Sequence, residues 1–301
     1  MRYRILLMVW IVVAQAVVAQ DLGIPTLTAK PTFLTLQRAC ELIEAHYVNP
    51  QLENSKVEQS AIIGLIKGLQ DPDTRYLSPS QALQLRAKQG LASSNRSKKE
   101  TPSVTQEMMF GTVGYLKLSS FESVNTTQRV LESIGRLKSQ FMKSLILDLR
   151  NNRGGMLDQA IGVLGAFMDH ADVAYTMYRD GYKHPLNVHG TAVYNGPLLV
   201  LINRNTASSS EIVAAAIQEL KRGIVLGEKS FGKASVQQVF DLPDGSALVM
   251  TVAHYVTPKG VNLSKTGVTP DVTLDSNPKL PGDPVLQQAI QEAMVEGYRK
   301  K

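Results

Sequence analysis

The chain has 301 residues, of which 44% are hydrophobic and 19% are charged. This composition is typical of a globular protein with a large core and excludes a chain that is disordered throughout. The formal net charge is +6, but the basic residues are scattered and are not interleaved with aromatic residues. We therefore expect no nucleic-acid partner.

The first residues predict an export signal. Arg2 and Arg4 precede the unbroken apolar run 5–13, and small residues follow. Ala19 fits the last position before a cleavage site, so residues 1–19 are predicted to be a signal peptide that is cleaved after Ala19. The alternative is an uncleaved anchor that keeps the protein near a membrane, although the run is short for a span of ~20 residues. Either reading predicts an exported protein, located in a bacterial periplasm or outside the cell.

The segment 20–90 is predicted to be a helical N-terminal region. Apolar residues recur at helical spacing around residues 42–47 and 62–69. The single cysteine, Cys40, falls within this pattern and cannot form an internal disulfide. Nothing nearby suggests a reactive partner, so we expect a buried structural thiol.

Residues 91–106 are polar and show no periodicity, which predicts a linker. After the linker, short apolar runs alternate with helical patterns. The predicted strands are 113–118, 145–149, 198–202, 224–226, 236–242 and 247–256, and the predicted helices are 126–142, 157–168, 210–220 and 283–298. Several of the strands are apolar at every position, which indicates burial on both faces and an α/β layer architecture. We expect one α/β core over 107–275 and a C-terminal helix within 276–301.

Small or polar residues follow three of the buried strands, where ligands usually bind in α/β sheets. Gly154 and Gly155 follow the first of them and could turn a backbone N–H into a site, but a tight turn explains the pair equally well. Ser208 follows the second, at the start of a helix that stabilises negative charge. Ser208 and Glu211 also form a capping-box pattern, in which the hydroxyl only accepts a backbone hydrogen bond. The residues alone leave both roles open.

The third segment resembles two motifs that it does not satisfy. Gly227 to Lys233 nearly matches a phosphate-binding loop, but Ala234 replaces the Ser or Thr that would hold magnesium, and a strand pattern follows. Residues 230–233 mimic the Ser-x-x-Lys motif, which needs one helical face, and Gly232 before a strand prevents this. The five histidines are dispersed and lack metal-ligand spacing. No metal or cofactor is expected.

Lysine is the plausible base if Ser208 is activated. A free lysine has a pKa near ~10.4 and is protonated at neutral pH, whereas burial in an apolar pocket lowers such a value by up to ~3–5 units. The partner of the amine should be neutral, because a carboxylate would favour the ammonium form. Gln237 meets this requirement for Lys233. Four residues of straight strand span roughly 13 Å, so the two side chains meet only if the chain curves.

Six segments, taken together and in order, resemble the carboxyl-terminal processing proteases (tail-specific proteases) of serine peptidase family S41. They are residues 71–79, 114–121, 147–155, 206–211, 227–237 and 257–272. The resemblance implies a ClpP/crotonase-like α/β fold for the core. It also implies that Ser208 is the nucleophile, Lys233 the base and Gln237 its orienting partner, with an oxyanion hole formed by the backbone N–H groups of Gly154 and Ser209.

Two features depart from the family pattern. The family usually carries a PDZ domain, which binds the C-terminus of the substrate, between the helical segment and the core, and only the predicted linker 91–106 occupies that place. Arg153 stands where the family often has proline before the glycine pair, which should alter the rigidity of the loop. Substrate selection through a PDZ domain is therefore not carried over to this chain.

The sequence thus predicts a serine endopeptidase that cleaves peptide bonds of exported proteins near their C-termini. Polypeptides are the expected substrates, and membrane proximity through residues 1–19 and a homo-oligomer are both compatible with these features. A non-catalytic peptide-binding scaffold of the same fold stays open as an alternative. An acyl-CoA-type enzyme on the same core is a third, which the predicted export disfavours.

Overall fold

A computed structural model of the chain describes residues 31–48, 54–94, 103–264, 266–274 and 282–299. The chain divides into two compact units, residues 1–68 and 69–301, which are described separately. The predicted signal peptide lies outside the described residues and stays a prediction. Within the described ranges, no helix has the length and apolar character needed to cross a membrane.

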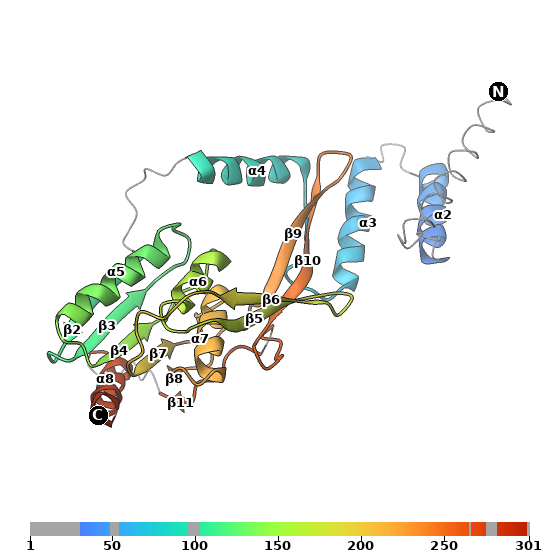
Figure 1. Cartoon of the computed structure of the whole chain (residues 1–301). Helices are drawn as coiled ribbons and strands as arrows, with labels where there is room; N and C mark the ends of the chain where they lie inside the picture. The colour runs from blue at the N-terminus through green and yellow to red at the C-terminus, as the bar shows by residue number, and fades with distance from the viewer. Residues whose placement is uncertain (1–30, 49–53, 95–102, 265, 275–281, 300–301) are drawn as a thin grey trace. The chain divides into compact units, whose positions relative to one another are not determined.

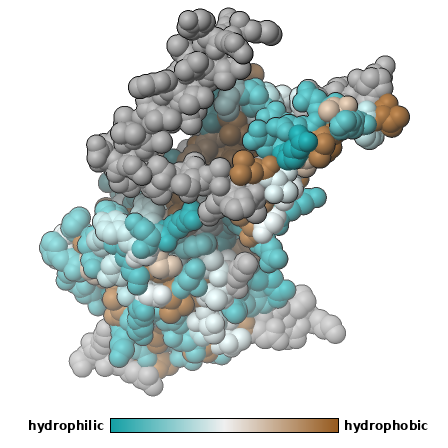
Figure 2. All heavy atoms as spheres, turned by 90° about the vertical axis from the view of Figure 1, so that its right-hand side faces the viewer, coloured by the Kyte–Doolittle hydropathy of each residue, from teal (hydrophilic) through white to brown (hydrophobic). Residues whose placement is uncertain are grey.

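The described residues of the smaller unit form two helices, α2 (Pro31–His46) and α3 (Asn54–Gly68), as the apolar spacing predicts. Cys40 is exposed, so the expectation of a buried thiol is wrong. The physical reason is that the two helices leave much of their apolar surface uncovered within this unit, and Leu34 and Leu65 are more than half exposed. Hydrophobic side chains are visible among hydrophilic ones on the molecular face drawn in Figure 2.

The larger unit is built on a six-stranded sheet with the order β11–β8–β7–β4–β3–β2. Its strands are β2 (Val104–Met109), β3 (Val113–Leu118), β4 (Ser144–Asp148), β7 (Leu198–Ile202), β8 (Ile224–Gly227) and β11 (Val272–Thr273). Neighbouring strands are parallel except for β2 and β3. Parallel neighbours need crossover connections, which helices usually supply. The helices are α5 (Thr126–Ser139), α6 (Leu157–Leu164) and α7 (Ser209–Glu219).

Both faces of this sheet are buried. Leu145 and Leu147 of β4 join the core that contains α5, α6 and α7, whereas Ile146 joins a second core with α8 (Pro284–Arg299) on the opposite face (Figure 1). Successive side chains of a strand point to opposite faces. Burial on both sides therefore explains why this strand is apolar at almost every position, and the predicted α/β layers and C-terminal helix are confirmed.

A second sheet has the strand order β1–β10–β5–β6, and β9 pairs with β10. Its strands are β1 (Arg75–Leu77), β5 (Ala171–Tyr178), β6 (Lys183–Val188), β9 (Ser235–Asp241) and β10 (Ala247–Val256). The hairpin predicted at Asp244-Gly245 joins β9 to β10, and Gly245 has the positive φ of 84° that such a turn needs. The sequence analysis did not predict β5 and β6, because β6 carries polar residues and a proline instead of a continuous apolar run.

Two predicted boundaries are wrong. The region 20–90 is not helical throughout, because β1 pairs with β10 and thereby ties residues after 68 to the larger unit. The predicted linker is shorter than 91–106, since α4 (Pro79–Ser94) occupies its first residues and β2 begins at Val104. Residues 95–102 of that linker lie outside the described residues.

Leu147 offers a test of the buried sheet. Its side chain is fully buried, whereas Leu83 on α4 is 65% exposed. Leu147→Ala is expected to lower the free energy of unfolding by roughly 2–5 kcal/mol, because it removes buried apolar area and leaves a cavity. Leu83→Ala, the same change at an exposed site, should alter it by less than about 0.5 kcal/mol. Urea unfolding followed by circular dichroism measures both, and equal losses would contradict this arrangement.

Candidate active site

The three polar segments that follow buried strands meet at one edge of the six-stranded sheet. The Ala207 N–H donates to the backbone oxygen of Asn152 at 3.0 Å, which joins the loops after β7 and β4. The Phe231 N–H donates to the backbone oxygen of Thr206 at 2.9 Å, which joins the loops after β8 and β7. This edge is the carboxyl end of the parallel strands, where sites in α/β sheets are expected.

Ser208 lies at the N-cap of α7 in a strained backbone conformation. Its φ is 59° and its ψ is −127°, a combination that residues with a side chain rarely adopt and that costs energy. Gly154, with φ +92°, lies against it: a Cβ added there would be 2.8 Å from the Ser208 Cβ and 3.0 Å from the Ser209 nitrogen. Only glycine fits this position. The loop after β4 therefore brings the Gly154 backbone, without a side chain, next to Ser208.

Glu211 fastens the serine and lysine segments to each other. Its side chain is buried, and one carboxylate oxygen, Oε2, accepts the N–H groups of Ser208 at 2.9 Å and Lys233 at 2.8 Å. The other, Oε1, accepts the Gly232 N–H at 2.7 Å and the Ser230 hydroxyl. A buried carboxylate needs such donors to offset the loss of hydration. The amides of Ser208 and Lys233 therefore converge on a single atom, and the predicted capping pattern accounts for only part of these contacts.

The two predicted oxyanion donors, the N–H groups of Gly154 and Ser209, differ in whether they already have a hydrogen-bond acceptor. The Gly154 N–H donates to Asn152 Oδ1 at 2.9 Å, and the buried Asn152 amide in turn donates to the Leu118 backbone oxygen. Ser209 is the first residue of α7, where backbone N–H groups have no acceptor within the helix. Gly154 and Ser209 thus lie together, but in this conformation the Gly154 amide is held inside its own loop.

Lys233 and Gln237 both contact Asp73 and are not hydrogen-bonded to each other. The Lys233 Nζ lies 3.8 Å from Asp73 Oδ1, and its side chain is 45% exposed. The Gln237 Nε2 donates to the Asp73 backbone oxygen at 2.6 Å. This differs from the predicted Lys233–Gln237 pairing in a buried pocket. The physical reason is that the turn before β1 supplies a carboxylate, which attracts an ammonium group more strongly than an amide does.

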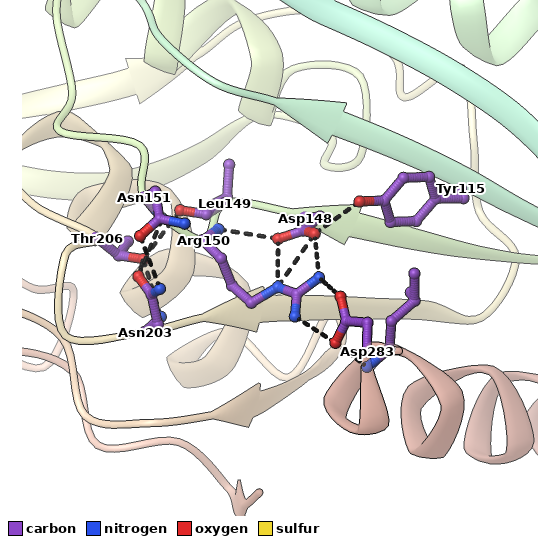
Figure 3. Close-up of polar contacts among 9 residues, drawn as sticks. Tyr115, Asp148, Leu149, Arg150, Asn151, Asn203, Thr206 and Asp283 are labelled. Atoms are coloured by element: carbon purple, nitrogen blue, oxygen red, sulfur yellow. Dashed lines mark hydrogen bonds and ion pairs between the residues drawn. The ribbon is translucent and has the colours of Figure 1, made fainter. Parts of the chain in front are cut away.

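A partly buried ionic cluster, which the sequence analysis missed, lies beside the site (Figure 3). Arg150 Nη2 donates to Asp148 Oδ2 at 2.7 Å and to Asp283 Oδ2 at 2.7 Å, and the Tyr115 hydroxyl donates to Asp148 Oδ2 at 2.7 Å. Asp148 is fully buried. The cluster therefore links the end of β4 to the start of α8 and to β3.

The charges of this cluster stabilise one another. Burial alone would lower the pKa of Arg150, but the hydrogen bonds and charges of Asp148 and Asp283 outweigh it and raise that pKa. Burial raises the pKa of the Tyr115 hydroxyl, and Asp148 raises it further. Burial works to raise the pKa of Asp283, but Arg150 and the Leu286 N–H hold it below its usual value.

Three asparagines connect this cluster to the serine loop. The Asn203 side chain donates to Asn151 Oδ1 at 3.0 Å, and Asn205 Nδ2 donates to the same oxygen at 2.9 Å. The Asn151 N–H donates back to Asn203 Oδ1, and Thr206 Oγ1 donates to the Leu149 backbone oxygen (Figure 3). The loop that carries Gly154 is thus held against the loop that carries Ser208.

The sequence held a signal for Asp148 and for the contacts that Glu211 makes beyond the capping box. Asp148 stands inside an apolar strand and Glu211 inside an apolar helix, and charged residues are rarely buried unless they have partners. A charge at a position predicted to be buried therefore indicates a hydrogen-bond network. No cluster of three or more His, Cys, Asp or Glu residues suited to a metal ion is found in the part of the chain that the structure describes.

Comparison with known proteins identifies the family. Residues 112–274 match peptidase family S41. The chain belongs to this family. The matched segment contains Ser208, Lys233 and Gln237, whereas Asp73 precedes it and Asp283 follows it.

Curated relatives agree with membership of family S41. The chain is 41% identical over 164 residues to a chloroplastic C-terminal processing peptidase of Tetradesmus obliquus, which covers 54% of this chain and 35% of that protein. It is 39% identical over 166 residues to a carboxyl-terminal-processing protease of Picosynechococcus sp., which covers 55% and 40%. The chain thus spans well under half the length of these relatives.

The fold of the S41 chain also resembles solved structures. The photosystem II D1 C-terminal processing protease superposes with a TM-score of 0.64 at 25% identity, over 82% of this chain and 94% of that one. A lipoprotein from Streptococcus agalactiae shares the fold, with a TM-score of 0.58 at 17% identity over 89% and 90%. These likenesses support the fold class that the sequence predicts.

Glu211→Gln tests the role of the shared carboxylate. Each oxygen accepts two donors, so the NH2 group of glutamine would face a pair of donors whichever way the amide turned. We expect the free energy of unfolding to fall by roughly 2–4 kcal/mol, because buried donors lose their acceptor. Glu292→Gln on the exposed face of α8 is the matched control and should have little effect. Equal stability of the two variants in denaturant titrations would refute the role of Glu211.

Asp283 predicts a pH dependence of stability. Its folded-state pKa is lowered from 3.8, so its contribution is present above that value and is lost as the pH falls through the folded-state pKa. Asp283→Asn should therefore lower the melting temperature at about pH 6, and this difference should disappear once the pH is well below the folded-state pKa. The effect should be small, on the order of 1 kcal/mol or less, because the side chain is 42% exposed. A difference that grows toward acid pH in calorimetry would contradict the assignment.

Proposed function

We propose that the protein is a serine endopeptidase that cleaves polypeptides near their C-termini, with Ser208 as nucleophile and Lys233 as general base. Membership of family S41 and the names of its relatives support the reaction class. The observation that carries the residue assignment is the Glu211 oxygen that accepts both the Ser208 and the Lys233 amide. The Glu211 carboxylate holds the strained Ser208 and Lys233 at the same edge of the six-stranded sheet.

The proposed chemistry is acyl transfer. The neutral Lys233 amine takes the Ser208 hydroxyl proton while Oγ forms a bond to the substrate carbonyl carbon. The resulting oxyanion is stabilised by the Ser209 N–H, and by the Gly154 N–H once it leaves Asn152. The C–N bond then breaks, the leaving amine takes the proton from Lys233, and water releases the acyl group from Ser208. Gln237 orients the amine during these steps.

The substrates are proposed to be exported proteins. This part of the proposal rests on the export signal predicted in residues 1–19, and on the same ground we place the protein in a bacterial periplasm or outside the cell. Proximity to a membrane and self-association belong to the same proposal.

A non-catalytic peptide-binding scaffold is the second candidate. The observation that favours it is the ion pair of Lys233 with Asp73 and the 45% exposure of the lysine side chain. A carboxylate partner and contact with water both favour the ammonium form, which cannot accept a proton. The two candidates differ in whether the Ser208 hydroxyl can be made reactive.

A fluorophosphonate probe separates them. We expect labelling of Ser208, located by mass spectrometry of peptides, that disappears in Ser208→Ala and in Lys233→Ala. Ser210→Ala is the matched control and should keep the label, because the buried Ser210 hydroxyl has no hydrogen-bond partner among the described residues. Labelling is measured from about pH 6 to about pH 10, because a lysine acts as a base only without its proton.

The other outcomes are also decisive. A native protein that stays unlabelled over this whole pH range would support the scaffold. A label on Ser209 or Ser210 would show that a different serine of the triplet is the nucleophile. Cleavage of a denatured model polypeptide, lost in the same two variants, would establish the peptidase activity itself.

A further inference from the structure

We propose that Asp73 is a positioning residue of this site, whose carboxylate holds Lys233 in an ion-paired, protonated form until that pair opens. The inference rests on the proposed function and adds a restraint to it. Asp73 lies in the turn that precedes β1, within the segment 71–79 that resembles the family and before residues 112–274, over which the family match extends.

The turn fixes Asp73 through its neighbours. Asp71 Oδ1 accepts the Asp73 N–H at 3.0 Å, and Asp71 Oδ2 accepts the Thr74 hydroxyl at 2.6 Å. Thr74 is buried, and its Oγ1 accepts the Thr251 N–H of β10 at 3.1 Å. The pairing of β1 with β10 begins at the next residue, Arg75. The backbone of Asp73 is therefore anchored to the second sheet.

Asp73 also contacts β9, the strand that begins two residues after Lys233. The Ser235 hydroxyl donates to Asp73 Oδ2 at 2.6 Å, and Gln237 Nε2 donates to the Asp73 backbone oxygen at 2.6 Å. Ser235 and Gln237 are two residues apart and so share one face of the strand. These contacts leave Oδ1 directed at the Lys233 Nζ, 3.8 Å away. Asp73 thus contacts both the Lys233 amine and the Gln237 amide, which the proposed mechanism pairs with each other.

The elements around the pair carry charged groups of both signs, since the Arg75 side chain donates to the Asp73 backbone oxygen at 3.4 Å. The turn contributes Asp71, whose burial would raise its pKa but whose hydrogen bonds and the nearby His254 of β10 lower it. From α7, Glu211 accepts the backbone N–H of Lys233 itself. The His254 ring contacts the Ser264 hydroxyl. The two side chains of β9 that contact Asp73, those of Ser235 and Gln237, are neutral.

The ion pair between Asp73 and Lys233 is weak enough to open, as its geometry shows. The Nζ–Oδ1 distance exceeds that of a hydrogen bond, and partly exposed ion pairs contribute little because water screens them. Removing the carboxylate should therefore increase the reactivity of Ser208 at neutral pH by a modest factor, and its pH dependence should move to lower pH. A residue with a purely structural role would not move that dependence.

The test compares fluorophosphonate labelling rates of the full chain across the pH range for four proteins: native, Asp73→Asn, Asp73→Ser and Asp241→Asn. Both Asp73 variants remove the charge while leaving the backbone contacts of the turn, and we expect roughly three- to tenfold faster labelling at about pH 7. Asp241→Asn removes the same charge from the far end of β9, where its partner is the exposed Arg86. This control should match the native protein.

The failures of the two proposals are distinguishable. If labelling depends on Lys233 but neither Asp73 variant changes its rate or its pH dependence, the role of Asp73 is overturned and the proposed function stands. Slower labelling in folded Asp73 variants, with unchanged melting temperatures, would also overturn it, since the carboxylate would then assist the base. If no variant is labelled at any pH, the proposed function itself fails.

Discussion

The site depends on one buried carboxylate, that of Glu211, which has no cationic partner among the residues that the structure describes. Glu211 is held by N–H and O–H donors alone, and three of them belong to the loop after β8. A carboxylate in that position can remain buried only while those donors surround it. The loop that carries Lys233 is therefore fixed to the helix that begins beside Ser208, although the two residues are separated in sequence and come from different strands.

The backbone of the proposed site is in place, but the side chains of Lys233 and Gln237 do not contact each other as the proposed mechanism requires. The Ser208 residue, the backbone of Gly154 and the first N–H of α7 lie together, as the proposed acyl transfer requires. Lys233, Gln237 and the Gly154 amide instead contact Asp73 and Asn152. The proposed reaction therefore requires short side-chain and loop movements rather than a rearrangement of the sheets.

Much of this architecture could be predicted from the sequence, for a physical reason. Runs such as that of β4 are apolar at nearly every position because both faces are covered, which identifies strands and their ends without further information. The partners of Lys233 could not be predicted in this way. Asp73 reaches the lysine only because β1 pairs with β10, and β1 is a three-residue strand with no apolar pattern of its own. Contacts between polar residues far apart in sequence depend on such pairings, and local patterns do not encode them.

Native-state hydrogen exchange tests the central claim most directly. The account predicts that the amide protons of Ser208, Gly232 and Lys233, observed individually by NMR, exchange slowly and with similar protection, because they share the Glu211 carboxylate. Protection of this kind is unusual for residues that follow a strand end. Exchange of the Gly232 or Lys233 amide at the rate of an open loop, while Ser208 stays protected, would contradict the account.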